Sequence, residues 1–297
     1  LYDHSGNGNH GTINGATWVE NIYGCTDSYA TNYDETANVD DGSCEYPDNG
    51  DYSLSFDGNS YIDVGDVEFE NNTELTLHAK VMFPILDGGA VTIISKYEGN
   101  SSVPGNTINR EFQLFRHDAQ REYKIYFGVS GDGFNDFEFA SQTSMTANKW
   151  YDIDVTFDGG LINLYIDNVL ENSHQENVIQ SIHLSDNPII LGGGLDEGIP
   201  VPTFNGFLDN VLIWNRALSE SEILSNNING SDLLVDFQFN SGSDDILYDH
   251  SGNRNHGTII GATWKYEIPL HSGANLISFM SLPEDKTVGN VLSPLDG

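Results

Sequence analysis

The chain has 297 residues, enough for one large β domain with smaller satellites or for two smaller domains. Eleven Lys and Arg residues stand against 45 Asp and Glu residues, giving a formal charge of -34 with no basic cluster, which excludes nucleic acid and anionic membrane faces as partners. With 38% hydrophobic and 11% aromatic residues the chain can still bury a core, which excludes a disordered acidic tail.

The acidic residues are dense in the N-terminal part of the chain. Lys80 is the first basic residue, and the 79 residues before it carry sixteen carboxylates. Because such a stretch repels itself unless cations neutralise it, we expect saline surroundings, a divalent metal or both. No segment approaches the roughly 20 apolar residues that span a bilayer, so we expect no membrane insertion.

Residues 1–18, the N-repeat, recur as residues 247–264, the C-repeat. The two segments read LYDHSGNGNHGTINGATW and LYDHSGNRNHGTIIGATW, so sixteen of eighteen positions are identical. Such identity marks an internal duplication. A strand-like run precedes only the C-repeat, so we expect residues 1–23 to be the tail of a preceding repeat unit. The C-repeat either closes the domain before it, which we favour, or opens a further domain.

Residues 24–49 form an acidic insert that contains both cysteines of the chain. Cys25 and Cys44 are nineteen positions apart, without a CxxC pair or nearby histidines. A single local disulfide is the simplest interpretation, and a thiolate metal site is the alternative. A disulfide indicates an oxidising compartment, so we expect an extracellular or cell-surface location.

The same insert is a candidate calcium site. Asp27, Asp40 and Asp41 are its candidate ligands, and Asp34 lies between them, all inside the predicted disulfide ring. The spacing is not that of an EF-hand. The alternative is that solvent screens these carboxylates and that they point outward.

Ten short runs with period-two alternation, separated by turn residues, occupy residues 50–265 and predict an all-β antiparallel sandwich. After Trp264 the sequence pattern changes, so residues 266–297 are expected to begin a following module. The runs are Tyr52–Phe56, Glu74–Phe83, Thr92–Lys96, Phe112–Arg116, Lys124–Val129, Tyr151–Phe157, Ile162–Ile166, Pro188–Leu191, Phe207–Trp214 and Leu233–Phe239.

One segment, Ser219–Asn227, has a helical pattern. Ser219 is a candidate N-cap, and Glu222 follows three residues later, as in a capping box. The sequence therefore predicts a single short helix in an otherwise β protein.

Several short motifs follow one another in a characteristic order. They are LSFDG at 54–58, NKWYD at 148–152, TFDG at 156–159, LYID at 164–167, LGGG at 191–194 and GFLDNV at 206–211 with IWNRALS at 213–219. This order resembles laminin G-like, concanavalin A-type jelly rolls, in particular the pentraxin-like branch common in bacterial surface proteins. The GCTD and DDGSC residues of the insert resemble a short insert of large secreted bacterial proteins. The resemblance implies a concanavalin A-like jelly roll over residues 50–265 with a small disulfide-bonded insert.

The resemblance also implies a structural calcium that ties a terminal loop to the last strand. Asp209 is the first candidate ligand, with Asp57, Asp249 and Asn253 as companions. These residue types supply the oxygens that calcium prefers. The alternative is that Asp57 and Asp249 cap turns, as Asp does before Gly or Asn.

Carbohydrate binding is the usual activity of this fold, so the resemblance implies it. The expected contact is a sugar stacked on an exposed aromatic ring. All four tryptophans occupy motif positions and are expected to be core residues. Tyr97, Tyr123 and Tyr126 are the remaining candidates, as are the long polar loops 100–109 and 194–204.

Other chemistry has little support in the sequence. His4, His10, His250 and His256 recur with the repeats, so either a zinc site or a loop-fixing hydrogen bond is expected there. No strand carries the E-x-D-x-x-E-like pattern of a catalytic jelly roll, so we expect no enzyme.

The sequence therefore predicts a non-enzymatic extracellular structural or adhesive repeat module that calcium stabilises. It would assemble with neighbouring copies of itself through its terminal repeats. The alternative is a lectin-like module that binds surface glycans.

Overall fold

The computed structural model describes residues 1–86, 88–99, 109–225 and 232–266. The chain forms two compact units, Leu1–Tyr46 and Pro47–Gly297. The division falls three residues before the predicted end of the insert at residue 49. Residues 267–297, which make up nearly all of the predicted following module, lie outside the described residues.

The first unit is small and is held by the predicted disulfide, which is confirmed. Cys25 and Cys44 are bonded, and Cys25 is buried. Strand β1 (Tyr23–Gly24) pairs in parallel with β2 (Val39–Asp40). Two short strands bury little surface, so the covalent bond is the main constraint on this segment.

The second unit is a sandwich of two sheets, and its first sheet has eight strands. The neighbours in this sheet are antiparallel, and β17 pairs with β16 at the side of the path. In spatial order the strands are β12 (Val169–Gln175), β11 (Leu161–Ile166), β10 (Trp150–Asp158), β5 (Glu74–Met82), β16 (Asn205–Trp214), β3 (Tyr52–Asp57) and β20 (Thr263–Tyr266), with β17 at Leu233–Phe237.

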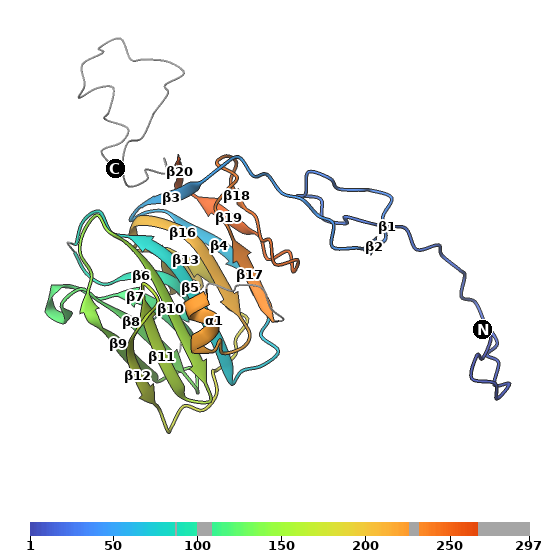
Figure 1. Cartoon of the computed structure of the whole chain (residues 1–297), viewed down its shortest axis with the longest axis horizontal. Coiled ribbons are helices and arrows are strands. Elements are labelled where there is room, and N and C mark those ends of the chain that lie inside the picture. The colour runs from blue at the N-terminus through green and yellow to red at the C-terminus, as the bar shows by residue number, and fades with distance from the viewer. Residues whose placement is uncertain (87, 100–108, 226–231, 267–297) are drawn as a thin grey trace, which may run out of the picture. The chain divides into compact units, whose positions relative to one another are not determined.

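The second sheet has ten strands, and Figure 1 shows it behind the first. The 3-10 helix η1 (Ala119–Arg121) connects β7 to β8. The main path is β18 (Ile246–Leu247), β19 (Gly257–Ile260), β4 (Tyr61–Gly65), β13 (Ile189–Leu191), β6 (Val91–Glu98), β7 (Asn109–Arg116), β8 (Lys124–Ser130) and β9 (Asp136–Ser144), and β14 (Gly193–Asp196) pairs with both β6 and β15 (Ile199–Pro202). Each of the ten predicted runs overlaps a strand of the two sheets, and three of them extend one or two residues beyond it.

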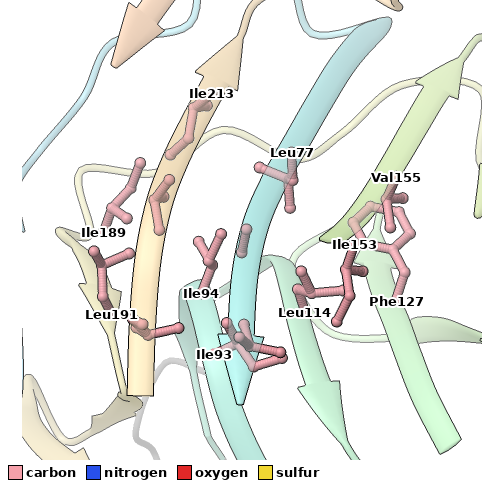
Figure 2. Packing of buried hydrophobic residues seen from close by; sticks show 14 of the residues in the cluster. Leu77, Ile93, Ile94, Leu114, Phe127, Ile153, Val155, Ile189, Leu191 and Ile213 are labelled. Carbon is pink, nitrogen blue, oxygen red and sulfur yellow. The ribbon is translucent and has the colours of Figure 1, made fainter. Parts of the chain in front are cut away.

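The core lies between the two sheets. Because side chains alternate across a strand, one face of each strand supplies Leu, Ile, Val and Phe to this layer. Leu77 of β5 and Ile153 of β10 come from one sheet, Leu114 of β7 and Phe127 of β8 from the other, and each has no exposed surface. Figure 2 shows these side chains pointing into the space between the sheets. Each such burial contributes about 1.5–3 kcal/mol.

The predicted helix is present as α1 (Glu220–Ser225), and residues 226–227 of the prediction lie outside the described residues. Ser219 Oγ donates to Glu222 Oε2 at 2.7 Å, and Ser219 N donates to the same atom at 2.8 Å. Ile223 packs with Trp214 and Leu212 on the outer face of the first sheet. No helix among the described residues has the length and apolar character needed to cross a membrane.

The C-repeat closes the sandwich at both sheets. Its strand β19 pairs with β4 in the second sheet, and β20, which begins within the C-repeat, pairs with β3 in the first. Leu247 and Ile259 of the C-repeat are buried against the core. The C-repeat therefore completes this domain from its C-terminal side, which is the arrangement favoured above.

Candidate functional site

A cleft of about 590 Å³ lies at one end of the sandwich, between the β8–β9 turn and the segment that follows β12. The turn (residues 131–137) forms one wall, and the segment (residues 176–181) forms the other. Carboxylates, amides and apolar side chains all contribute to its lining. The lining residues are Gly131, Asp132, Asn135, Asp136, Phe137, Glu176, Val178, Ile179, Gln180 and Ser181.

The turn wall is shaped by the carboxylate of Asp132. Its Oδ1 accepts hydrogen bonds from the backbone N–H groups of Phe134 and Asn135, each at 2.8 Å, and its Oδ2 accepts from Asn135 Nδ2 at 2.9 Å. These donors, Asn135 first, hold the pKa of Asp132 well below its usual range. The wall therefore presents a fixed, ionised carboxylate at neutral pH.

Arg110 braces the same turn from β7. Its Nη1 donates to Asp136 Oδ1 at 2.6 Å and to the carbonyl oxygen of Phe134 at 3.1 Å. The guanidinium lies 5.2 Å from the ring centroid of Tyr97, whose hydroxyl donates to Asp136 Oδ2 at 3.3 Å. Burial, and then the charge of Asp136, raises the pKa of Tyr97. Tyr97, a predicted platform, is thus half-buried and supports the turn.

The opposite wall is organised around Glu176. Its Oε1 accepts from Val178 N at 2.7 Å, and its carbonyl oxygen accepts from Gln180 Nε2 at 2.7 Å. The hydrogen bond from Val178 N lowers the pKa of Glu176. Glu176 N donates to the carbonyl oxygen of Gly160, where φ is +94° and a Cβ atom would clash with the Glu176 carbonyl oxygen. The close packing of this wall therefore depends on glycine at position 160.

Backbone and side-chain hydrogen bonds next to the cleft hold the chain that follows residues 176–181 to other strands. His183 N donates to the carbonyl oxygen of Ser130 at 2.8 Å, and Ile182 N donates to that of Asn72 at 2.7 Å. The His183 Nε2 atom lies 2.7 Å from Asn109 Oδ1. The segment after β12 is thus attached to β8 and to the start of β7, and the cleft is formed before any ligand arrives.

A buried ion pair anchors the segment farther along. Lys96 Nζ lies 3.0 Å from Glu111 Oε1 and 2.9 Å from Asp66 Oδ1, and it also donates to the carbonyl oxygen of Ser185. Glu111 is fully buried and accepts from the backbone N–H and hydroxyl of Ser185. Burial raises the pKa of Glu111, against the opposing effects of Ser185 and Lys96. The chain after the segment wall is therefore held to β6 and β7 by charge-assisted hydrogen bonds.

Apolar groups lie at the rim of the cleft. Val178, which lines the cleft, is 88% exposed, and Phe134, which lies on the turn but outside the lining, is 58% exposed. Phe137 is half-buried and stacks on His174, with ring centroids 4.8 Å apart. Apolar surface beside amides and ionised carboxylates suits a ligand that has both hydroxyl groups and C–H faces.

Asp209 and Asp57, predicted calcium ligands, each have a protein partner. Asp209 is buried on β16, and its Oδ2 accepts from Lys80 Nζ at 2.7 Å. Asp57 is exposed, and its Oδ1 accepts from Asn59 N at 2.9 Å, so it caps a turn. While the ammonium group of Lys80 holds the Asp209 carboxylate, this carboxylate does not suit a calcium ion, because the ammonium group and the calcium ion would repel each other at that distance.

Asp249 organises the loop of the C-repeat. This buried carboxylate accepts from the backbone N–H groups of Asp236, Ser251 and Asn255, each at 2.9 Å. Asn253 Nδ2 donates to the carbonyl oxygen of Leu233 at 2.7 Å. Both residues fix the loop to β17.

Asn253 also lines a second hollow, of about 570 Å³, that is strongly acidic. The lining comprises Asp66, Glu68, Glu70, Asn215, Asp232, Leu233, Leu234, Asn253 and Asn255. Asp209 and Asp57 do not belong to it. The structure thus does not gather the four predicted ligands into one site.

The acids of the insert serve individual turns. Asp27 is buried and accepts from the hydroxyl of Tyr46 at 2.6 Å. Asp40 accepts from Gly42 N at 3.1 Å, and Asp41 accepts from Ser43 N at 3.0 Å. Within the described part of the chain, no group of three or more His, Cys, Asp or Glu side chains gathers in a metal-binding arrangement. Calcium binding stays a prediction.

Two of the four repeat histidines, His10 and His256, take part in loop-fixing hydrogen bonds. His10 Nδ1 accepts from Asp3 N at 3.0 Å, and His256 Nδ1 accepts from Asp249 N at 2.9 Å. Trp214 is buried as expected, whereas Trp18 is 78% exposed, so the expectation of a core role for all four tryptophans is wrong for Trp18.

Most residues that line the cleft are absent from the sequence-based predictions. Of the predicted tyrosine platforms, Tyr126 is buried and Tyr123 lies against Arg116, 5.3 Å from the guanidinium to the ring centroid. Residues 100–108 of one predicted loop lie outside the described residues. The sequence does contain one indication of the turn wall. The turn-forming run DGFND at 132–136 lies between two segments with period-two alternation.

The comparisons with known proteins identify the fold family. The family model described as the concanavalin A-like lectin/glucanases superfamily matches residues 56–224, more than half of the chain. The chain belongs to this superfamily. The predicted fold class, a concanavalin A-like antiparallel sandwich with one disulfide, is confirmed. No curated protein matches the sequence.

The solved structures to which this chain is similar are distant in sequence. A candidate carbohydrate-binding protein from Bacteroides ovatus is 16% identical, with 80% of this chain and 68% of that chain covered and a TM-score of 0.55. A heptameric SAP-like pentraxin from Limulus polyphemus is 13% identical, with 60% and 82% covered and a TM-score of 0.44. The CBM40 module of a Ruminococcus gnavus sialidase, bound to alpha2,3 sialyllactose, is 12% identical, with 59% and 95% covered and a TM-score of 0.44.

Proposed function

We propose that this chain is a non-enzymatic carbohydrate-binding module that holds a glycan in the cleft between residues 131–137 and residues 176–181. The observation that carries the proposal is the composition of this preformed cleft, which places ionised carboxylates and amides beside exposed apolar groups. Membership of a lectin and glucanase superfamily supports it, as does the fold shared with the Bacteroides ovatus candidate carbohydrate-binding protein.

The chemistry of the lining matches that of a sugar. Hydroxyl groups can donate to Asp132 and Glu176 and accept from the amides of Asn135 and Gln180. The C–H face of a pyranose can lie on the exposed ring of Phe134. Because both carboxylates are held by backbone N–H groups, little ordering remains to be done when the ligand binds.

The electrostatics of the cleft favour binding over hydrolysis. A glycosidase needs one carboxyl group with a raised pKa to protonate the leaving oxygen. Hydrogen bonds lower the pKa of Asp132 and of Glu176, and Arg110 is paired with Asp136. Neither Asp132 nor Glu176 is therefore tuned as an acid near neutral pH, so we infer that the module does not cleave its ligand.

The Cys25–Cys44 disulfide is consistent with an extracytoplasmic location, and we infer an extracellular or cell-surface one. There the ligand would be a surface glycan. A purely structural or adhesive role, which the sequence favoured, receives less support, because it does not account for the cleft. Calcium remains a proposed stabiliser, and the acidic hollow that Glu68 and Glu70 line would attract it by charge, although the acids there do not gather in a metal-binding arrangement among the described residues.

A glycan array that covers plant, algal, bacterial and animal polysaccharides, followed by calorimetry, tests the proposal. Phe134→Ala should weaken binding about fivefold, since one aromatic stacking contact contributes about 1 kcal/mol. Tyr266→Ala, which removes an aromatic ring of similar exposure on β20, is the control and should bind like the wild type. Failure to bind any glycan, or release of reducing ends from the bound one, would contradict the proposal.

A further inference from the structure

The N-repeat forms on its own the same loop as the C-repeat. In the N-repeat, Asp3 Oδ1 accepts from Ser5 N at 2.8 Å and Asp3 Oδ2 accepts from Asn9 N at 2.9 Å. Asp249 makes the corresponding two bonds in the C-repeat at 2.9 Å each. The Tyr–His ring pair is also reproduced, with centroids 5.7 Å apart in the N-repeat and 5.9 Å in the C-repeat. The shared sequence therefore encodes the loop locally.

In the C-repeat this loop is a docking element. Asn253 Nδ2 donates to the carbonyl oxygen of Leu233 at 2.7 Å, and Asp249 Oδ1 accepts from Asp236 N at 2.9 Å, which fixes the loop to β17. The strands that follow add to β4 and β3. A single segment thus binds three strands of both sheets.

The N-repeat carries the same docking groups, but its first side chains are exposed where those of the C-repeat are buried. Tyr2 is 84% exposed and Leu1 is 64% exposed, whereas their counterparts Tyr248 and Leu247 are buried. Asp3 and Asn7 stand where the C-repeat has its docking residues Asp249 and Asn253. The only two differences between the repeats fall at Arg254, which is exposed, and Ile260, which is half-buried. No fully buried contact of the C-repeat is therefore altered in the N-repeat.

We propose that the N-repeat of one molecule docks on β3, β4 and β17 of a second molecule, in the place of that molecule's C-repeat. The interaction is an exchange of matched segments: the N-repeat supplies to each sheet the strand that the C-repeat otherwise supplies. Its occupant is a second copy of this chain because the N-repeat is identical at sixteen of eighteen positions to the C-repeat, the segment that fits this docking surface. Since the C-repeat is tethered to its own surface, its effective concentration is high. Exchange therefore increases when the C-repeat is weakened.

Matched substitutions in the full chain test the exchange. Asp249→Ala weakens the C-repeat and should raise the dimer fraction at least tenfold over the wild type, measured by size-exclusion chromatography with light scattering over a range of concentrations. Asp3→Ala in addition weakens the competing N-repeat and should return the dimer fraction to the wild-type level. Equal mass distributions for the single and double variants would overturn the proposal. If Asp249→Ala does not fold, Asn253→Ala replaces it, with Asn7→Ala as its partner.

A cysteine pair locates the docked segment. Thr258 faces Asp63 across β19 and β4, and Thr12 is the N-repeat equivalent of Thr258. Thr12→Cys with Asp63→Cys, in the Asp249→Ala background, should give a covalent dimer on a denaturing gel that reduction converts to monomer. Thr258→Cys with Asp63→Cys is the control and should cross-link within one molecule. Absence of a cross-link through Thr12→Cys, or a cross-link within one molecule, would overturn docking on a second copy.

Discussion

The buried ammonium of Lys96 helps to hold the chain that follows the cleft wall of residues 176–181. Its Nζ lies between Glu111 and Asp66, and it is 2% exposed. Lys96→Met keeps most of the aliphatic stem but removes the positive charge. The fully buried carboxylate of Glu111 then loses its nearest cation, although the hydrogen bonds from Ser185 remain.

Removing one partner of a buried ion pair costs about 3–5 kcal/mol, because the other charge stays desolvated. We therefore expect Lys96→Met to lower the free energy of unfolding by that amount. Lys96→Met combined with Glu111→Gln should recover most of the loss, since the amide oxygen still accepts from Ser185. Lys149→Met removes an exposed ion pair with Asp167 and should cost less than about 1 kcal/mol.

Denaturant unfolding followed by tryptophan fluorescence measures these differences. The loss also depends on pH, because burial raises the pKa of Glu111 in the folded state. A raised folded pKa gives a stability contribution that is full below the unfolded value of about 4.3 and is lost as pH rises through the folded pKa. Without Lys96 the folded pKa rises further, so the deficit of Lys96→Met should be small in acid and grow toward neutral pH. A deficit below about 1 kcal/mol at neutral pH, or one independent of pH, would refute this reasoning.

Three further predictions concern the cleft wall, calcium and the insert. Gly160→Ala forces a Cβ against the Glu176 carbonyl oxygen at a positive φ, so unfolding free energy should fall by about 2–3 kcal/mol and glycan affinity should fall with it; unchanged melting and binding would contradict this. Calcium should raise the melting temperature less in Glu70→Gln than in the wild type. Asp209→Asn should keep the wild-type rise, because Lys80 already neutralises that carboxylate. Identical wild-type melting curves in calcium and in chelator would exclude calcium binding. Cys25→Ser should cost the first unit about 3 kcal/mol and expose it to proteolysis while the sandwich melts unchanged; an insert that resists protease without the bond would show that the disulfide is dispensable.

The strands were predictable because period-two alternation is a local property of the sequence. The helix cap was also predictable, since Ser219 and Glu222 are three residues apart and the Glu222 carboxylate accepts from Ser219 N as a capping box requires; the second bond differs, because Ser219 Oγ donates to the same carboxylate. Turn capping by Asp57 likewise follows from its immediate neighbours.

The cleft was not predictable in the same way, because its two walls come from residues 131–137 and residues 176–181. The pairing of the strands and tertiary contacts such as the hydrogen bond from His183 N to the Ser130 carbonyl oxygen bring these segments together. The partner of Asp209 was hidden for the same reason: Lys80 lies 129 residues away in the sequence, on the neighbouring strand β5. Charges paired across sheet neighbours are set by topology, which local patterns do not encode.

The most direct test of glycan binding in the cleft is a crystal structure of the chain with an oligosaccharide selected on the glycan array. The account predicts a sugar ring between the two walls, with hydroxyl groups on Asp132 or Glu176 and a C–H face on Phe134. A sugar bound elsewhere on the sandwich, with the cleft empty, would contradict it.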